Sequence, residues 1–351
     1  MSKSDHKHGE VLGTGAGLAA SVALEAGPEL GEGIDAVKAR GYWEQVWIRL
    51  RRDKVAIGSA IFIVFLFLAS FVGSVIAEKL LGHGPNDLFF DGVDERLIPV
   101  GPMSYVTDPA TGEKALLILG ADSTLGRDEF LRLLYGGRVS LQVAILSTIG
   151  AMSIGVTLGA IAGYFRGWID TIISRITEVT MAFPALLFII ALASTVGGRI
   201  DAVTFGIFAP GVITLVLVFT VFGWFYPCRI IRAQVLSLRE KEFVEAARMI
   251  GSSDARIIRS HLLPHLVAPI IVFSTLVVAG YVLGEAGLSF LGLGIKLPTA
   301  SWGNLLATAP EFYTTQPWLM VWPGLAVLAT TLSFNLLGDG LRDAFDPRSS
   351  L

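Results

Sequence analysis

The sequence predicts an all-α integral membrane protein with six transmembrane helices, and three observations support this expectation. Hydrophobic residues make up 53% of the 351 positions, charged residues only 16%, and the mean hydropathy is +0.64. Such an apolar balance is typical of membrane proteins. The apolar residues are gathered into runs of about twenty or more, long enough to cross a hydrocarbon core of about 30 Å as helices. Polar segments rich in proline or charge separate these runs.

The composition also argues against several classes of function. The net charge of −3 is spread over the loops and forms no basic patch for nucleic acid. The single cysteine, Cys228, allows neither an intrachain disulfide nor a cysteine-based metal cluster. No GxxxxGK[ST] phosphate loop is present, so we expect no ATP hydrolysis by that mechanism. We therefore predict no catalytic residue, no metal site and no cofactor in this chain, which we do not expect to be an enzyme.

The order of polar and apolar segments predicts five parts. The first residues mix Gly, Ala, Glu and Lys without a sustained apolar period, which is typical of a disordered tail. No signal-peptide core follows, so we expect the first span to remain as an anchor. The parts are a disordered cytoplasmic tail (1–41), an interfacial helix with the first transmembrane helix (42–77), an external loop (78–137), the main transmembrane domain (138–342) and a cytoplasmic tail (343–351).

The lead-in to the first span is amphipathic. Trp43, Val46 and Trp47 fall on one helical face of residues 42–54, and the arginines fall largely elsewhere. This pattern is typical of a helix lying on the cytoplasmic leaflet. Residues 55–77 then form the first apolar run.

The external loop is too long and too broken by proline to remain in lipid. Asp108 to Gly112 has strong turn chemistry between two short β-prone runs, and this predicts a small hairpin.

The last turn of that loop concentrates charge. Asp122, Gly126, Arg127 and Asp128 are expected to form a salt-bridged cap that holds the segment on the outer surface. The alternative is a catalytic or cation site, which we disfavour because no nucleophile lies nearby in the sequence.

Two glycine patterns in the main domain predict close helix packing. Gly155, Gly159 and Gly163 recur at every fourth position, so they share one helical face that lets backbones approach. Gly280 and Gly284 predict a second such face. The spans of this domain are expected at about 139–163, 171–196, 205–226, 266–290 and 318–337.

One carboxylate, Glu178, interrupts the third apolar run. An acidic residue inside a membrane is a functional candidate by default. Because Glu178 lies near the end of its span, we expect instead a structural pairing with Arg175 or contact with water.

The distribution of positive charge sets the expected orientation. With six spans, 19 of the 27 Lys and Arg residues fall on the side that holds both termini, and 8 on the other. The positive-inside rule therefore predicts that both termini and residues 239–264 are cytoplasmic.

Residues 239–264 are a charged, helix-forming insert between two spans. Phe243, Ala247 and Ile250 fall on one face of a short amphipathic helix over 240–250. Gly251 is expected as a left-handed C-cap.

A second short helix is expected to follow that corner. Ser253 is its expected N-cap, and Pro264 marks a break before the next span. Ala246 and Ala247 leave a small surface that another protein's backbone can approach, with Glu245 and Arg248 beside it. The alternative is a loop that only connects two spans.

Two motifs resemble a known family. Glu245-Ala246-Ala247, then Gly251, then His261-Leu262-Leu263-Pro264 is similar to the EAA loop of ABC importer permeases. The segment 120–128 resembles the GTDxxGRD segment of peptide and nickel permeases. The family usually has isoleucine where this chain has His261, and threonine where it has Ala121.

The resemblance implies the type I ABC importer, or MetI-like, permease fold with a cytoplasmic coupling helix, in the plasma or inner membrane of a bacterium or archaeon. It implies four kinds of partner besides the lipid bilayer: a second homologous permease, two ATPase subunits that bind ATP and Mg, and an extracytoplasmic substrate-binding protein. It also gives Glu285 a position near the lumen mouth.

The resemblance makes peptides the expected cargo, with nickel, haem or oligosaccharides as alternatives inside the class. A secondary transporter or channel is the alternative from another class. Such proteins usually place ion-coupling acids or unwound helices at the midplane, and neither explains the charged insert.

Overall fold

The computed structural model describes residues 41–109, 112–182, 184, 187–192, 195 and 208–346. The chain divides into Met1–Gln45 and Val46–Leu351. The expected disordered tail lies almost wholly outside the described residues, as does most of the C-terminal tail. α2 (Tyr42–Arg52) begins at the end of the first unit, and all later elements belong to the second.

Five helical stretches in the described residues are long and apolar enough to cross a membrane. Each contains most of one predicted span and extends beyond it. The five stretches are Lys54–Leu81, Glu129–Phe165, Val212–Leu238, Asp254–Phe290 and Trp318–Phe345. The second is α5 and the fifth is α14, whereas the first consists of α3 (Lys54–Leu68), a π-helical turn (Ala69–Gly73) and α4 (Ser74–Leu81). The third consists of α8 (Val212–Gly223) and α9 (Phe225–Leu238), and the fourth of α11 (Asp254–Arg256), a π-helical turn (Ile257–Leu262) and α12 (Leu263–Phe290).

The predicted third span, 171–196, begins within α6 (Gly167–Ala182) and continues partly outside the described residues. The stretch formed by α8 and α9 runs to Leu238, whereas the fourth predicted span was expected to end near residue 226. Its backbone stays helical beyond the apolar run because Arg229 and Arg232 favour helix as well as an apolar residue does.

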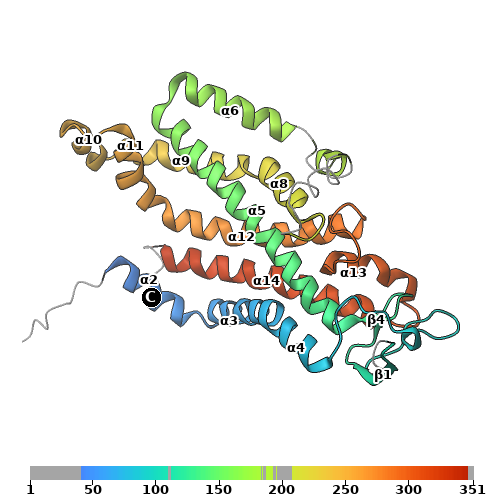
Figure 1. Cartoon of the computed structure of the whole chain (residues 1–351). Helices are drawn as coiled ribbons and strands as arrows, with labels where there is room; N and C mark the ends of the chain where they lie inside the picture. Colours follow the sequence, from blue (N-terminus) through green and yellow to red (C-terminus); the bar gives the residue numbers. More distant parts are fainter. Residues whose placement is uncertain are drawn as a thin grey trace, which may run out of the picture. The chain divides into compact units, whose positions relative to one another are not determined.

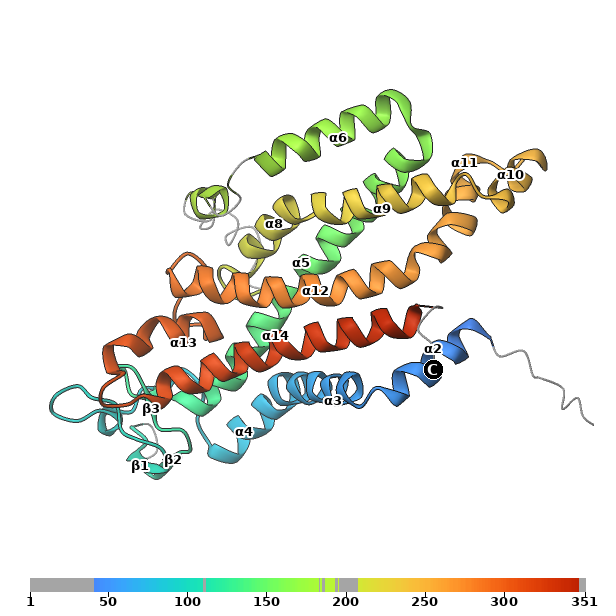
Figure 2. The ribbon, with the colours of Figure 1, turned by 180° about the vertical axis from the view of Figure 1, so that it is seen from behind.

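The helices of the second unit pack as a bundle around α5 (Figure 1). α5 lies against α8, α9 and α12, and α14 lies between α12 and α3, as the opposite view in Figure 2 also shows. Buried side chains from α3, α5, α12 and α14 meet in one core that includes Ile63, Leu141, Val282 and Phe334. Trp302 of α13 (Trp302–Thr308) closes this core at one end.

A small polar subdomain connects α4 to α5. Its core is formed by Phe89, Val106, Ala115, Leu117 and Ala121. β1 (Ser104–Thr107) and β2 (Lys114–Leu117) pair antiparallel across the turn expected from the sequence, with Tyr105 opposite Leu116. A second short pair, β3 (Ala121–Asp122) and β4 (Arg127–Asp128), leads into α5. We call the end of the bundle that carries this subdomain the loop end.

The opposite end carries the charged insert between α9 and α12, and we call it the corner end. The longest helix of this insert is α10 (Glu242–Met249), which has about two turns. Tyr164, in the last turn of α5, donates a hydrogen bond of 2.6 Å to Asp254 and so fastens the insert to the bundle. α5 therefore connects the two ends over 37 residues, or about 55 Å.

The glycine face of α5 is packed against the backbone of α9. A Cβ atom on Gly155 would lie 2.7 Å from Trp224 O, one on Gly159 would lie 2.6 Å from Cys228 O, and one on Gly163 would lie 2.8 Å from Arg232 O. No side chain fits at these distances. The two helices thus approach each other within one chain.

The expected second glycine face is built differently. A Cβ atom on Gly284 would meet the Phe219 ring at 3.2 Å, and one on Gly280 would meet no described atom within 4 Å. The structure therefore shows no close packing at Gly280 within the described chain, and the packing of this second face stays a prediction.

We predict that Gly159→Leu prevents α5 and α9 from packing. The added side chain collides with backbone rather than with a movable side chain, and overpacking of a core costs about 1–3 kcal/mol even where neighbours can move. The yield of monodisperse protein in detergent and its unfolding temperature should both fall.

The matched control for that substitution is Gly58→Leu. Gly58 is also helical, but a Cβ atom there meets nothing within 4 Å. Equal yields and unfolding temperatures for the two variants would contradict the packing account.

Candidate functional site

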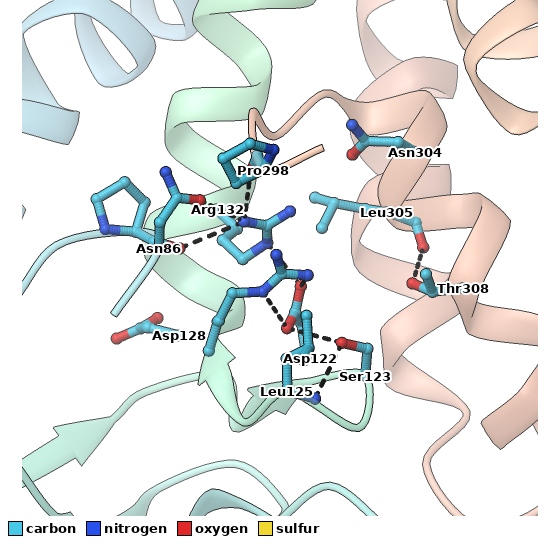
Figure 3. Close-up of polar contacts among 12 residues, drawn as sticks. Asn86, Asp122, Ser123, Leu125, Asp128, Arg132, Pro298, Asn304, Leu305 and Thr308 are labelled. Carbon is cyan, nitrogen blue, oxygen red and sulfur yellow. Dashed lines mark hydrogen bonds and ion pairs between the residues drawn. The ribbon is translucent and has the colours of Figure 1, made fainter. Parts of the chain in front are cut away.

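A buried ion-pair network lies where the subdomain joins α5 (Figure 3). Asp122 accepts a bidentate pair of hydrogen bonds from Arg127, at 3.0 Å from Nε and 2.9 Å from Nη2. Nε of Arg132 lies 2.6 Å from the same carboxylate. Asp122, Arg127 and Arg132 are all at most 3% exposed. Two guanidinium groups therefore share one carboxylate in a dry environment.

Arg132 also ties separate parts of the chain together. Its Nη1 donates to Asn86 Oδ1 at 2.8 Å and to the carbonyl of Pro298 at 3.1 Å. Figure 3 shows these bonds converging from the loop after α4 and from the segment before α13. A single side chain of α5 thus fixes two loops that are more than 150 positions apart in sequence.

Asp128 forms the second half of the network. Its Oδ1 accepts from the Leu131 amide at 2.9 Å and caps the N-terminus of α5, while its Oδ2 lies 2.9 Å from His83 Nε2. The other ring nitrogen of His83 faces the Leu81 carbonyl at 3.1 Å. Both ring nitrogens face acceptors, which the protonated imidazole satisfies best.

Two opposing effects act on the pKa of His83. Burial lowers the pKa, but the hydrogen bond with Asp128 and the negative charges of Asp128 and Asp87 outweigh burial, so the pKa is raised above its usual value of 6.5.

The four residues expected as an external cap therefore lie together. Gly126 has φ of 67°, and a Cβ atom there would lie 2.3 Å from Phe89 O, so only glycine fits. His83 and Arg132 were not predicted as members, because His83 pairs with Asp128, 45 positions away, and Arg132 joins loops that the sequence pattern does not bring together. Within the described residues, no group of three or more His, Cys, Asp or Glu side chains is arranged to hold a metal ion.

Another buried carboxylate, that of Glu285 of α12, is held by serines. Ser140 of α5 and Ser289 each donate a hydrogen bond of 2.6 Å, and the Ser301 hydroxyl supplies a third. Glu285 is 0% exposed. It thus joins α5, α12 and the start of α13.

At the corner end, α10 stops in a Schellman motif. The Ser252 amide donates to Ala247 O at 3.0 Å and the Gly251 amide to Arg248 O at 2.9 Å. Gly251 has φ of 81°, as expected for its left-handed position. Ser253 occupies the N-cap position of α11, but its side chain makes no capping hydrogen bond.

The buried face of α10 differs from the expected one. Val244 and Ala247 are 0% and 3% exposed and pack against Ile257 and Leu262. Ile250 is 81% exposed. Its assignment to the apolar face was wrong, because α10 ends at Met249 and the chain turns at Gly251 before Ile250 can reach that face.

The availability of Ala247 to another protein was also predicted wrongly, since its methyl group is buried in this chain. Four exposed residues at the C-terminal end of α10 and just after it form a surface that we call the corner face: Glu245, Ala246, Met249 and Ile250. Met249 is 84% exposed, so two large apolar side chains project from a charged segment.

The helix after the corner is continuous, which corrects the expected break at Pro264. The wide turn Ile257–Leu262 carries the backbone into α12, and Leu263 N bonds to Ile258 O, five residues back. Pro264 then sits in the first turn of α12, where its missing N–H costs little. His261 and Leu263 are half-buried beside this turn.

One ion pair lies within α6, and a second joins α6 to α9. Arg175 and Glu178 pair at 2.7 Å and are both exposed, as their spacing predicts. Arg232 of α9 donates to Asp170 at 2.7 Å through Nη2, and its hydrogen bonds lower the pKa of Asp170.

Comparison with known proteins identifies relatives over most of the chain. Residues 155–351 match the family model "Binding-protein-dependent transport system inner membrane component", and residues 41–94 match "N-terminal TM domain of oligopeptide transport permease C". The dipeptide transport system permease protein DppC of Alkalihalophilus pseudofirmus is 36% identical over 90% of this chain and 92% of its own.

A second relative and a solved structure are also similar to this chain. The glutathione transport system permease protein GsiD of Pectobacterium atrosepticum is 36% identical over 87% of this chain and 91% of its own. A chain of the inward-facing MetNI methionine ABC transporter aligns with 61% of this chain and 96% of its own, with a TM-score of 0.46 and 17% identity.

We predict that Asp122→Ala destabilises the protein by about 3–5 kcal/mol, because it leaves Arg127 and Arg132 buried without their shared counter-ion. Thermal unfolding in detergent should report the loss. Asp91→Ala is the control, since Asp91 is exposed and has no side-chain hydrogen bond in the described structure. Similar unfolding temperatures for both variants would count against a stabilising role of the network.

The raised pKa of His83 predicts a pH-dependent stability. Protonation favours the folded state, so the contribution of His83 is full below its unfolded pKa near 6.5 and is lost as pH rises through the higher folded pKa. The stability difference between the natural protein and His83→Gln should therefore be larger at acidic than at alkaline pH.

The control for that pH dependence is Asp128→Asn, which removes the main partner of His83. In this background the difference caused by His83→Gln should vary much less with pH. A difference that instead grows as the pH rises would show that burial dominates the titration of His83.

Proposed function

The chain belongs to the family of inner membrane components of binding-protein-dependent transport systems, and we propose that it is the permease subunit of a peptide importer. The observation that supports this most directly is the similarity, over nearly the whole chain, to permeases named for dipeptide and glutathione transport. A dipeptide and glutathione share an amide bond, and a free carboxylate. Peptide cargo is therefore favoured over nickel, haem or oligosaccharides.

Proteins of this family are transport subunits and not enzymes. Energy for uptake must then come from elsewhere, and we propose two separate ATPase subunits that bind the ATP and Mg. The corner face supports this proposal. Met249 and Ile250 project from a charged helical end that cannot lie in lipid. If a partner protein covers them, they become buried at the interface, and a few such buried side chains dominate the binding free energy of protein interfaces.

The remaining partners follow from the architecture of such systems. We propose a second homologous permease beside the bundle and an extracytoplasmic binding protein at the loop end. The excess of Lys and Arg at the corner end favours a cytoplasmic position for that end and for both termini, in a bacterial or archaeal plasma membrane. No nucleic acid is expected as a partner.

In this mechanism the ATPases move the corner face, and α9 and α12, which flank it, carry the movement into the membrane. The EAA-loop residues then act in different ways. Glu245 and Ala246 contact the ATPase, whereas Ala247, Gly251, His261, Leu263 and Pro264 hold the shape of the corner.

The proposal predicts that the double variant Met249→Asp/Ile250→Asp inserts and folds normally but loses the ATPase subunits. Placing two charges in an apolar contact should reduce ATPase co-purification and uptake of a labelled tripeptide by about tenfold or more. The measurement uses the complete complex in proteoliposomes, with peptide-loaded binding protein outside and ATP inside.

Two controls separate docking from folding. Ser260→Asp adds a charge at an exposed site beside the corner face and should leave uptake unchanged. Ala247→Arg should reduce the yield of folded chain, because Ala247 is buried within the chain. Uptake by the double variant at the level of the natural protein would overturn the docking role of the corner face, and ATP-independent uptake by the natural protein would overturn the importer.

A further inference from the structure

A cavity near the loop end borders the ion-pair network, with which it shares Asn86, and lies far from the corner face in sequence. It has a volume of about 260 Å³ and is lined by the loop after α4, the second to fourth turns of α5, residues just before α8, and the segment before α13. Its polar walls are formed by Asn86, Tyr135, Arg138, Gln142 and Thr299, and its apolar walls include Phe208.

The cation in this cavity has no counter-ion among the described residues. No carboxylate lies within 4.0 Å of Arg138, whose guanidinium group instead lies over the Phe71 ring, 5.6 Å from its centroid. The carboxylate of Glu78 accepts a hydrogen bond from the hydroxyl of Tyr135, which lines the same cavity. Arg138 is therefore a fixed charge with its hydrogen-bond donors available.

Two amide groups beside Arg138 are also available. The side chain of Gln142, one helical turn further along α5, has no hydrogen bond in the described structure. Asn86 directs its Oδ1 to Arg132, so its NH2 group remains as a donor. Three donor side chains thus line one cavity, and one of them is permanently charged.

We propose that this cavity binds the carboxylate of the cargo, which for a peptide is its C-terminal carboxylate. This inference rests on the proposed function and names the chemical group that the permease recognises. A guanidinium group matches a carboxylate because two parallel N–H groups face two oxygens. The amides of Gln142 and Asn86 can bond the remaining lone pairs.

The size of the cavity fits one end of a peptide. Sites for whole ligands of drug size occupy about 300–1,000 Å³, and this cavity lies just below that range. Phe208 provides an apolar wall for the side chain next to the carboxylate. The rest of the cargo must lie outside the cavity, which suits a subunit that forms only half of a pathway.

The first test compares two peptides that differ only in that group. Initial uptake of a tripeptide with a free carboxylate and of its C-terminal amide is measured in proteoliposomes of the complete complex, with the binding protein saturated by each peptide. The natural protein should prefer the free acid. In Arg138→Gln this preference should fall by about tenfold, the effect of one charge-assisted hydrogen bond.

Arg96→Gln is the matched control, because Arg96 is an exposed arginine of the polar subdomain and lies outside the cavity. It should keep the preference of the natural protein. If Arg138→Gln also keeps it, or slows both peptides equally at normal complex yield, the inference is overturned.

The second test does not depend on peptide transport. Thr299→Cys, in a Cys228→Ala background, places a thiol in the cavity wall for reaction with methanethiosulfonates in membranes. A carboxylate-bearing reagent should react faster than a neutral one of equal size, and Arg138→Gln should lower this rate ratio by about fourfold, the effect of one charge at close range in water.

Together the two tests distinguish failure of the carboxylate site from failure of the proposed peptide importer. If no peptide is imported but the thiol ratio depends on Arg138, the cavity still binds carboxylates and the peptide importer fails. A ratio that Arg138→Gln leaves unchanged overturns the carboxylate site, whatever the cargo of the importer.

Discussion

The close approach of α5 and α9 is the constraint on which the rest of the structure depends. At Gly155, Gly159 and Gly163 the backbone of α9 occupies the space that a side chain would need. Inside a membrane, an apolar helix face is as stable against lipid as against another helix. Which helices associate therefore depends largely on how closely their backbones can pack. This contact fixes the direction in which α9 leaves the membrane, and α9 leads directly into the corner face.

α5 also links the two polar ends of the bundle. At the loop end Asp128 caps α5 and Arg132 binds two loops, and at the corner end Tyr164 holds Asp254. The buried charges at the loop end are costly to desolvate, and their mutual pairing offsets that cost. Removing one partner leaves the other charge buried without a counter-ion, so each member of this network depends on the others.

The two ends differ in what they leave exposed. At the loop end, the charged side chains of Asp122, Arg127 and Arg132 are buried and pair with one another. At the corner end Ala247 is buried, and Met249 and Ile250 face outward. Under the proposed function, Arg138 would be covered by the carboxylate of the cargo, and Met249 and Ile250 by an ATPase subunit.

The sequence by itself determined the membrane class, the spacing of the α5 glycines, the left-handed Gly251 and the family, because each depends on local periodicity or on residues close together in the chain. It also identified three members of the buried ion-pair network, Asp122, Arg127 and Asp128. Only the tertiary structure decided that His83 and Arg132 complete that network, that serines hold Glu285, and that Gly280 is not closely packed within the described chain. It also decided that Ala247 is buried while Ile250 is exposed. The physical reason is that burial and pairing depend on which distant segment covers a face, and the period of a helix states only which residues share that face.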